Sequence, residues 1–483
     1  MGLFPMRGEL ADLQGVFFGR LCGRADAQAA ALRYMPGFDP AGYFHDMYGF
    51  PRGSIDIQSS NRRLPIVLVK TLYGFAATPR RLKALEKESQ HWWLENTAKT
   101  MTPASARALF AEAIDRHAAA LYVHTYASTF GPAFLGAVAK LAAAAGKPEL
   151  AGHAVTSGSL RETTMLTDIW RLSRDEITLD DFISAHGFYG PDPAELSEPS
   201  WRESSASIHK VAASYHGKTA LSPADRIKKQ GVNKDAAVAE LLESVDKRQR
   251  ISARLVIRLA QQWVPYREIG KAAFLQAFDC ARHAASAIGK DLYDSGLVDA
   301  PDDVFYLTAD EILGALPSDV RAQITFRRLK RTEHHAVRPP SSWIGNPDPL
   351  PVETAMASNE TLAGTGVSPG VFEGKARVIL DPGSCEDALE PYEILVARTT
   401  DPSWASMFMS AGALVIDQGN SVSHAAIIAR ELGIPCVMGT IHGTASIVDG
   451  SILRVDGSTG AVEVIDQDIE LTTGLTTASK ESS

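Results

Sequence analysis

One histidine of the chain lies where a strand, a tight turn and a helix are expected to meet. Residues 417–433 read DQGNSVSHAAIIARELG, and His424 opens the helical pattern. Ser421 and Ser423 are residue types that favour a helix N-cap, and with Gly419 they form a candidate phosphate-binding turn. The free N–H groups and the positive dipole end of a first helical turn favour a neutral ring and attract anions. His424 is therefore a candidate nucleophile for phosphoryl groups, and an exposed histidine without a catalytic role is the alternative.

A second candidate site lies in the sequence YREIGKAAF, residues 266–274. Arg267 and Lys271 are four residues apart, so a helix places both on one face, where they repel each other by roughly a few tenths of a kcal/mol. An anion between the two side chains would remove this repulsion, and a phosphoryl group is such an anion. The alternative is a solvated helix face on which Arg267 pairs with a neighbouring carboxylate.

The two candidate sites fall in regions of different composition. Residues 103–145 and 235–285 carry apolar residues three and four apart, which predicts long amphipathic helices. After residue 364, β-branched runs alternate with turns, and strands are expected at KARVIL, EILVAR, ALVID, CVMG, SILRVD and AVEVID. A short helix is expected from His424 to a glycine. The sequence thus predicts a large, mainly α-helical domain followed by a small α/β domain.

Composition also places the boundaries of these domains. We assign residues 1–336 to the helical domain, residues 364–466 to the α/β domain and residues 467–483 to a polar tail. Residues 337–363 are rich in Pro, Ser, Asn and Gly, which predicts a flexible linker. The small domain is therefore expected to move relative to the helical domain.

The overall composition argues against several classes of protein. The 483 residues are 45% hydrophobic and 22% charged, which is typical of globular proteins. The net charge of −9 opposes the Lys and Arg excess of nucleic-acid-binding proteins, so no nucleic-acid partner is expected. The four cysteines have no metal-binding spacing and indicate no oxidising compartment. Without a signal peptide or a long apolar run, we expect a cytoplasmic protein with no membrane contact.

Three stretches of the α/β region carry a family resemblance. The sequences GTGVSPGVFEGKARVI, ILVARTTDPSW and SVSHAAIIARELGIPCVMGT resemble the phosphohistidine swivelling domain of the phosphoenolpyruvate-utilising enzymes. The resemblance implies that His424, in the S-H-A-A-I-x-A-R-E motif, is phosphorylated and carries the phosphoryl group between two distant sites. Where the family usually has a T-x-x-G-G turn, this chain has Ile416 and Asn420 in place of the Thr and the second Gly.

The helical region resembles the acceptor-binding domain of rifampicin phosphotransferase and related ATP-dependent phosphotransferases. The resemblance rests on HGFYGPDPAELSEPSWRE, YREIGKAAF and LVDAPDDVFYLTADEI. It implies that the R-E-x-x-K residues Arg267, Glu268 and Lys271 contact the phosphoryl group at the acceptor site. Relatives have G-H-R where residues 187–189 are Gly-Phe-Tyr here, which favours a different acceptor.

The two resemblances together imply one subunit of a split, ATP-dependent phosphotransferase. No Gly-rich phosphate loop or ATP-grasp sequence precedes residue 336, so a separate ATP-grasp partner is expected to hold ATP and Mg²⁺ and to phosphorylate His424, releasing AMP and phosphate. No metal site is expected in this chain. Arg267 and Lys271 would then neutralise charge during transfer to an acceptor hydroxyl. The arrangement is similar to phenylphosphate synthase and the alkylphenol-phosphorylating enzymes of aromatic compound degradation, so a phenol or alkylphenol is the expected substrate.

Two alternatives and one assignment stay open at this stage. The acceptor is alternatively an antibiotic or another large natural product. The chain is alternatively a non-catalytic regulatory or scaffold subunit, a reading motivated by Ile416 and Asn420. The base that would deprotonate the acceptor is open among His45, His124, His186 and His216.

Overall fold

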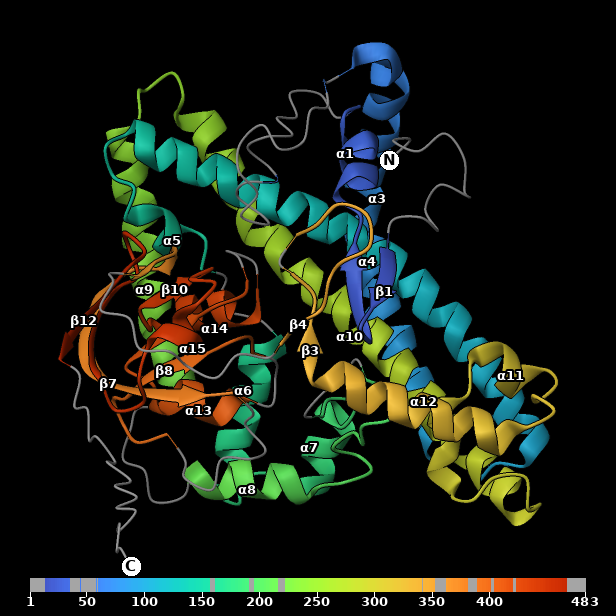
Figure 1. The fold of residues 1–483 in the computed structure, drawn as a ribbon. Helices are drawn as coiled ribbons and strands as arrows, with labels where there is room; N and C mark the ends of the chain where they lie inside the picture. The colour runs from blue at the N-terminus through green and yellow to red at the C-terminus, as the bar shows by residue number, and fades with distance from the viewer. Residues whose placement is uncertain are drawn as a thin grey trace, which may run out of the picture.

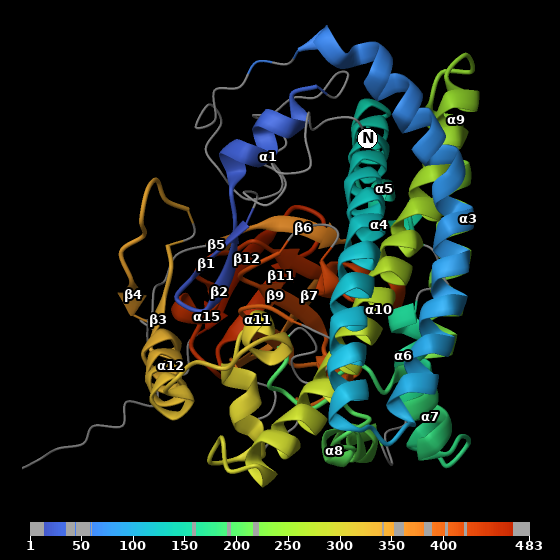
Figure 2. The ribbon, with the colours of Figure 1, turned by 90° about the vertical axis from the view of Figure 1, so that its right-hand side faces the viewer.

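The computed structural model describes residues 14–34, 44, 58, 60–156, 161–190, 195–215, 222–340, 342–351, 362–380, 389–400, 404–419 and 423–466. Within them, a set of long helices lies beside a small sheet domain, and Figures 1 and 2 show the sheet domain against one side of these helices. The predicted fold class, a large and mainly α-helical domain followed by a small α/β domain, is confirmed.

Three long helices form the body of the helical domain and run side by side in Figure 2: α3 (Leu64–Thr97), α4 (Pro103–Ala144) and α10 (Arg250–Asp294). A capping box between Thr102 and Ser105 starts α4. Helix α10 packs against both α3 and α4 along an apolar cluster that includes Phe130 and Trp263. This packing fixes α10, which carries the R-E-x-x-K residues.

Shorter elements complete the helical domain. They are α1 (Ala25–Leu32), α5 (Leu150–Ala154), α6 (Arg161–Leu172), α7 (Leu179–His186), α8 (Ala206–Tyr215), α9 (Pro223–Ser244), α11 (Ala309–Leu313), α12 (Val320–His335) and the 3-10 helices η2 (Asn61–Arg63) and η3 (Pro301–Tyr306). The helical pattern expected over residues 235–285 is divided, because α9 ends at Ser244 and α10 begins at Arg250. No helix in the described part of the chain has both the length and the apolar character to cross a membrane.

The small domain is built on a sheet in the order β5-β12-β11-β7-β8-β9-β10-β6. The strands are β5 (Leu362–Ala363), β6 (Thr365–Ser368), β7 (Val371–Ile379), β8 (Ile394–Ala397), β9 (Ala413–Ile416), β10 (Cys436–Met438), β11 (Ile452–Asp456) and β12 (Ala461–Asp466). Strands β7 to β10 are parallel, and β8 and β9 are entirely buried, as apolar runs in parallel sheets are. Helices α13 (Ala405–Ser410), α14 (His424–Leu432) and α15 (Gly443–Ser446) complete the domain. Each of the six runs predicted as strands coincides with one, although β7 begins at Val371, before the predicted run KARVIL.

Two small hairpins lie where the helical domain ends. Strand β1 (Gln14–Phe17) pairs with β2 (Arg20–Gly23), and β3 (Val337–Arg338) pairs with β4 (Leu350–Pro351). The Arg20 guanidinium donates to the carbonyls of His334, at 3.1 Å, and Val337, at 2.8 Å. The segment predicted as a linker therefore begins in this hairpin and ends in β5, while residues 352–361 and the predicted tail lie outside the described residues.

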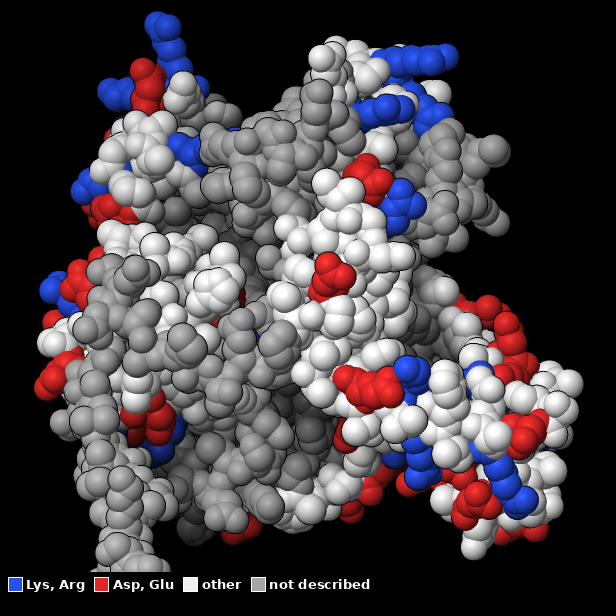
Figure 3. Space-filling model, viewed as in Figure 1, with Lys and Arg blue, Asp and Glu red and all other residues white. Residues whose placement is uncertain are grey.

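The basic sequence FRRLKRTEHH lies on α12, where acidic side chains interleave with the cations (Figure 3). Its ion pairs are Arg327–Glu311, Arg328–Asp303, Lys330–Glu333 and Arg331–Glu195. This mixture of charges is typical of a solvated helix rather than of a surface for polyanions.

The two domains are docked through short helices. Helix α14 packs on α9 and α6, α13 packs on α8, and β6 lies against α5. Buried residues of both domains, such as Met165 and Phe408, belong to one apolar cluster. Gly433 at the end of α14 packs directly against Gln230 of α9, with no space for a Cβ. The docked arrangement positions the first turn of α14 against the helical domain.

Candidate active site

His424 is the first residue of α14 and lies at the carboxyl ends of the parallel strands β8 and β9. The helix ends where Gly433 takes the left-handed conformation, with φ of 69°, as the sequence predicts. The His424 side chain is 6% exposed and packs on Phe408, with 5.4 Å between ring centroids. Its Nδ1 lies 3.4 Å from the hydroxyl oxygen of Thr400, which follows β8. A hydrogen on Nδ1 directed at that oxygen leaves Nε2 with the free lone pair.

The turn before His424 is anchored by hydrogen bonds to Asp417 and is tightly packed. Asp417 accepts hydrogen bonds from the Thr440 hydroxyl, at 2.8 Å, and from the Thr444 N–H, at 3.1 Å. Gly419 has φ of 140°, and a Cβ on it would lie 2.9 Å from the Ser423 hydroxyl oxygen. Ser423 occupies the N-cap position, as expected, although its side chain makes no cap hydrogen bond. Ser421 lies outside the described residues.

The His424 ring faces Glu162 across the domain boundary. Glu162 belongs to the first turn of α6, and its Oε2 lies 3.8 Å from Nε2 of His424. The other carboxylate oxygen, Oε1, accepts a hydrogen bond from Nζ of Lys271 at 2.9 Å. The Glu162 side chain is 3% exposed. The sequence analysis did not select Glu162, because an isolated Glu in an amphipathic helix carries no local signal of a site.

The structure brings the R-E-x-x-K residues of α10 to the same place. Lys271 pairs with Glu162, and Arg267, which is also largely buried, interacts electrostatically with Glu162 and Glu268. Glu268 is buried, and its Oε2 accepts a hydrogen bond from the Glu162 N–H at 3.4 Å. The anion that compensates the two cations in this structure is therefore a protein carboxylate, close to the ring of His424.

Burial sets the ionisation of the groups in this cluster. It lowers the pKa of His424 to about 4, with Lys271 and Arg267 acting in the same direction and Glu162 opposing them. The ring is thus neutral, and its contact with Glu162 is not an ion pair at neutral pH. Burial would raise the pKa of Glu162, but Lys271, His424 and Arg267 together bring it below its usual value. Burial, followed by the Glu162 charge, raises the pKa of Glu268 well above its usual value, so Glu268 binds a proton more readily than Glu162.

His124 supports the cluster from α4. Its Nδ1–H donates to the Arg267 carbonyl at 3.0 Å, and its Nε2 accepts from the Ser128 hydroxyl at 3.0 Å. Burial lowers its pKa to about 4, and the Arg267 charge adds to this effect. With both nitrogens engaged, His124 holds α10 rather than serving as a base. Of the other candidate bases, His186 pairs with Asp168 at 2.9 Å, and His45 and His216 lie outside the described residues.

The aromatic pair at 188–189 borders the site from the segment after α7. Tyr189 is buried, and burial, followed by the charge of Glu162, raises the pKa of its phenol. Phe188 packs edge-on against Trp93, with 5.3 Å between ring centroids. Both residues are part of the apolar core that supports the cluster.

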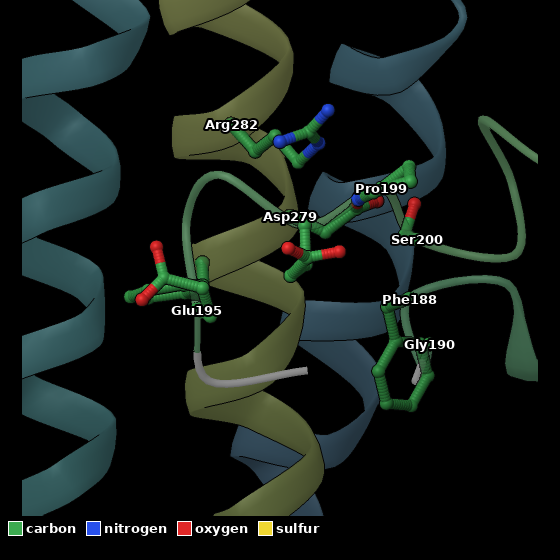
Figure 4. A pocket seen from close by; sticks show the side chains of 9 residues that line it. Phe188, Gly190, Glu195, Pro199, Ser200, Asp279 and Arg282 are labelled. Carbon is green, nitrogen blue, oxygen red and sulfur yellow. The ribbon is translucent and has the colours of Figure 1, made fainter. Parts of the chain in front are cut away.

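Two hollows of the helical domain lie apart from the ring of His424. One, between Phe188, Asp279 and Arg282, has a volume of about 10 Å³, room for a single water (Figure 4). The other, of about 440 Å³, lies between α3, α4 and α10. It is bordered by Ala273 and Ala277, which project from the opposite side of α10 to Lys271. Neither hollow is lined by residues of the His424 cluster.

Comparison with known proteins gives one match in the α/β domain and one in the helical domain. Residues 389–460 match the mobile domain of PEP-utilising enzymes. The α/β domain is thus similar to the mobile domain of these enzymes. Residues 132–268, which include Glu162, Arg267 and Glu268, match the fourth domain of rifampicin phosphotransferase. The mobile domain and the matched helical region meet at His424.

Curated relatives are similar to about half of this chain. An uncharacterised protein of Mycobacterium tuberculosis (strain ATCC 25618 / H37Rv) is 36% identical over 217 residues, which is 45% of this chain and 25% of that protein. Rifampicin phosphotransferase of Streptomyces sp. is 33% identical over 49% of this chain and 28% of its own length. Prodigiosin synthesizing transferase PigC of Serratia marcescens is 30% identical over 58% of this chain and 32% of its own length. The chain thus spans about a quarter to a third of these relatives.

Proposed function

We propose that this chain carries a phosphoryl group on His424 and transfers it to the hydroxyl of a small aromatic acceptor, a phenol or alkylphenol. The observation that carries the proposal is the position of His424 Nε2, 3.8 Å from Glu162 and beside the Lys271–Glu162 pair. A carrier ring of a mobile domain is thus docked where cations and carboxylates of the helical domain converge.

The chemistry of the cluster suits phosphoryl transfer. A buried neutral ring has a free lone pair on Nε2, which a phosphoryl group needs in order to be accepted. During transfer to an acceptor, negative charge spreads over the phosphoryl oxygens, and Lys271 and Arg267 would stabilise it in a site that excludes water. Burial and the Glu162 charge raise the pKa of Glu268, which favours its uncharged form and lessens its repulsion of a phosphoryl group.

The phosphoryl donor is proposed to be ATP, held with Mg²⁺ by a separate ATP-grasp partner that phosphorylates His424 and releases AMP and phosphate. The relatives support a larger assembly, since they are roughly three to four times as long as the regions they share with this chain. A phosphoryl group loaded at the partner must then travel on the mobile domain to the cluster of Glu162 and Lys271.

A larger natural product is a second candidate acceptor. Two of the relatives are named rifampicin phosphotransferase and prodigiosin synthesizing transferase. For both candidate acceptors, the phosphoryl group would leave His424 at the same cluster. The two proposals therefore differ only in the identity of the acceptor.

The test is to incubate the full chain with its ATP-grasp partner and ATP labelled in the β-phosphate. We expect an acid-labile, alkali-stable label on the chain, lost in His424→Ala and retained in a matched control, His442→Ala, which alters an exposed histidine of the same domain. Chase with phenol, an alkylphenol or a rifamycin then identifies the acceptor class. A chain that never takes the label would contradict the proposal and favour a scaffold role.

A further inference from the structure

Glu162 has one carboxylate oxygen with no hydrogen-bond donor among the described residues. While Oε1 accepts from Lys271, Oε2 is fully buried, unpaired and 3.8 Å from Nε2 of His424. A buried unpaired carboxylate oxygen costs about 1–3 kcal/mol or more, and such exceptions call for an explanation. Its direction toward the carrier nitrogen points to a role in the transfer itself.

The space beside Oε2 is where the reacting atoms must lie. In a near-attack arrangement, reacting atoms are about 3–3.5 Å apart. A phosphoryl group bonded to Nε2 and an acceptor oxygen beyond it cannot both fit within the 3.8 Å between Nε2 and Oε2. The Glu162 side chain must therefore retreat when the loaded ring and the acceptor are present, which leaves its carboxylate beside the incoming hydroxyl.

The charges around Glu162 favour an ionised carboxylate that can still accept a proton. Lys271 and Arg267 face it from α10, and the neutral ring of His424 faces it from α14. Glu268 on α10 and Tyr189 after α7 also face it, and the pKa values of both groups are raised, which favours their uncharged forms. Among the described residues, the hydrogen bond to its carboxylate comes from Lys271.

We propose that Glu162 is the general base that removes the proton from the acceptor hydroxyl, an inference that rests on the proposed function. The bond between the acceptor oxygen and phosphorus forms while the Nε2–phosphorus bond breaks, and its electron pair returns to Nε2. The hydroxyl proton moves to Oε2 of Glu162. The ring, which keeps its proton on Nδ1 toward Thr400, becomes neutral, and the protonated Glu162 is reset by solvent when the domains separate.

The experiment uses the full chain, loaded on His424 by the ATP-grasp partner, in single-turnover reactions with two acceptors. Glu162→Gln keeps an oxygen for Lys271, so loading should be unchanged. Transfer to phenol should slow by about 10²- to 10⁴-fold, the usual contribution of a general base. With 4-nitrophenol, whose hydroxyl is more acidic, the loss should shrink at least tenfold, because less help is needed to remove the proton. A purely structural role of Glu162 predicts equal losses with both acceptors and would overturn the proposal.

Glu268→Gln serves as the matched control, since it changes the neighbouring carboxyl group. Any loss in that variant should be the same with phenol and 4-nitrophenol. A further measurement needs no organic acceptor: the phosphoryl group on His424 is lost slowly to water, and Glu162→Gln should lengthen its half-life. An unchanged half-life would contradict a basic role for Glu162, whereas failure of His424 to load would instead contradict the proposed function.

Discussion

Replacing Lys271 with Met tests whether the cluster depends on the pair between the Lys271 ammonium and the Glu162 carboxylate. The substitution keeps the apolar stem and removes the ammonium that donates to Glu162 at 2.9 Å. Breaking a buried pair costs about 3–5 kcal/mol, because a charge is left uncompensated. The Glu162 side chain is 3% exposed and the Lys271 side chain is 22% exposed. Because Lys271 keeps some contact with solvent, we expect the free energy of unfolding to fall by about 3 kcal/mol, the lower end of that range.

The assay is urea unfolding of the full chain, read as a double-mutant cycle with Glu162→Gln. Lys271→Met alone should be the most unstable variant, and adding Glu162→Gln should restore part of the loss, because no charge then remains unpaired. Lys290→Met is the matched control on the same helix. Its pair with Asp294 is 2.8 Å long, but the side chains are 71% and 57% exposed, so its loss should be about 0.5 kcal/mol or less.

The same variant separates loading from transfer. Lys271→Met should accept label on His424 normally, because the partner performs that step, but transfer to the acceptor should be slowed. A loss of stability no larger than that of Lys290→Met would refute the argument that the Lys271–Glu162 pair is energetically buried. Unimpaired transfer would refute its role in stabilising the phosphoryl group.

Two further predictions concern the docking of the domains. Between pH 7 and pH 5 docking should weaken: the pKa of His424 is about 4 in the docked form and returns toward 6.5 in water, so the undocked form binds more protons and gains about 2 kcal/mol by pH 5. Small-angle scattering should show expansion that His424→Gln reduces; equal dimensions at both pH values would contradict this. Gly433→Ala should also weaken docking. The left-handed backbone costs about 1 kcal/mol with a Cβ, and the new methyl group clashes with Gln230. Hydrogen exchange of α14 measures the effect. Adding Gln230→Ala should relieve the clash alone, and undisturbed exchange in Gly433→Ala would argue against this contact.

Much of the fold could be predicted because local patterns and tertiary packing agree. The buried strands β8 and β9 read as continuous apolar runs, and α14 ends at a glycine that the left-handed cap requires. The division between α9 and α10 was not predicted. Residues 245–249, VDKRQ, contain neither Gly nor Pro, so the break has no strong local signal.

The candidate site was predictable only where its residues share a motif. His424 follows a turn, and Arg267 and Lys271 share a helix face, so their spacing in the sequence is enough to predict them as site residues. Glu162 lies more than a hundred residues before Lys271 in the chain, and it becomes part of the cluster only when α6 packs against α10 and α14 docks. No local pattern encodes such a contact. The same holds for His124, whose role follows from its bond to the carbonyl of Arg267.

The burial of His424 has opposite consequences for the empty and the loaded ring. A cationic ring is disfavoured in the docked position, as its lowered pKa shows, and a phosphorylated ring that keeps its Nδ1 proton is also cationic. Under the proposed function, docking would therefore disfavour the cationic ring of a loaded His424, which would favour release of the phosphoryl group to the acceptor. The negative charge of Glu162 partly offsets the burial, because it raises the pKa of His424. Under the proposed mechanism, Glu162 would lose this charge when it takes the acceptor proton, and the offset would then disappear. Under the proposed function, His424 would therefore be phosphorylated away from the cluster and would give up the phosphoryl group within it.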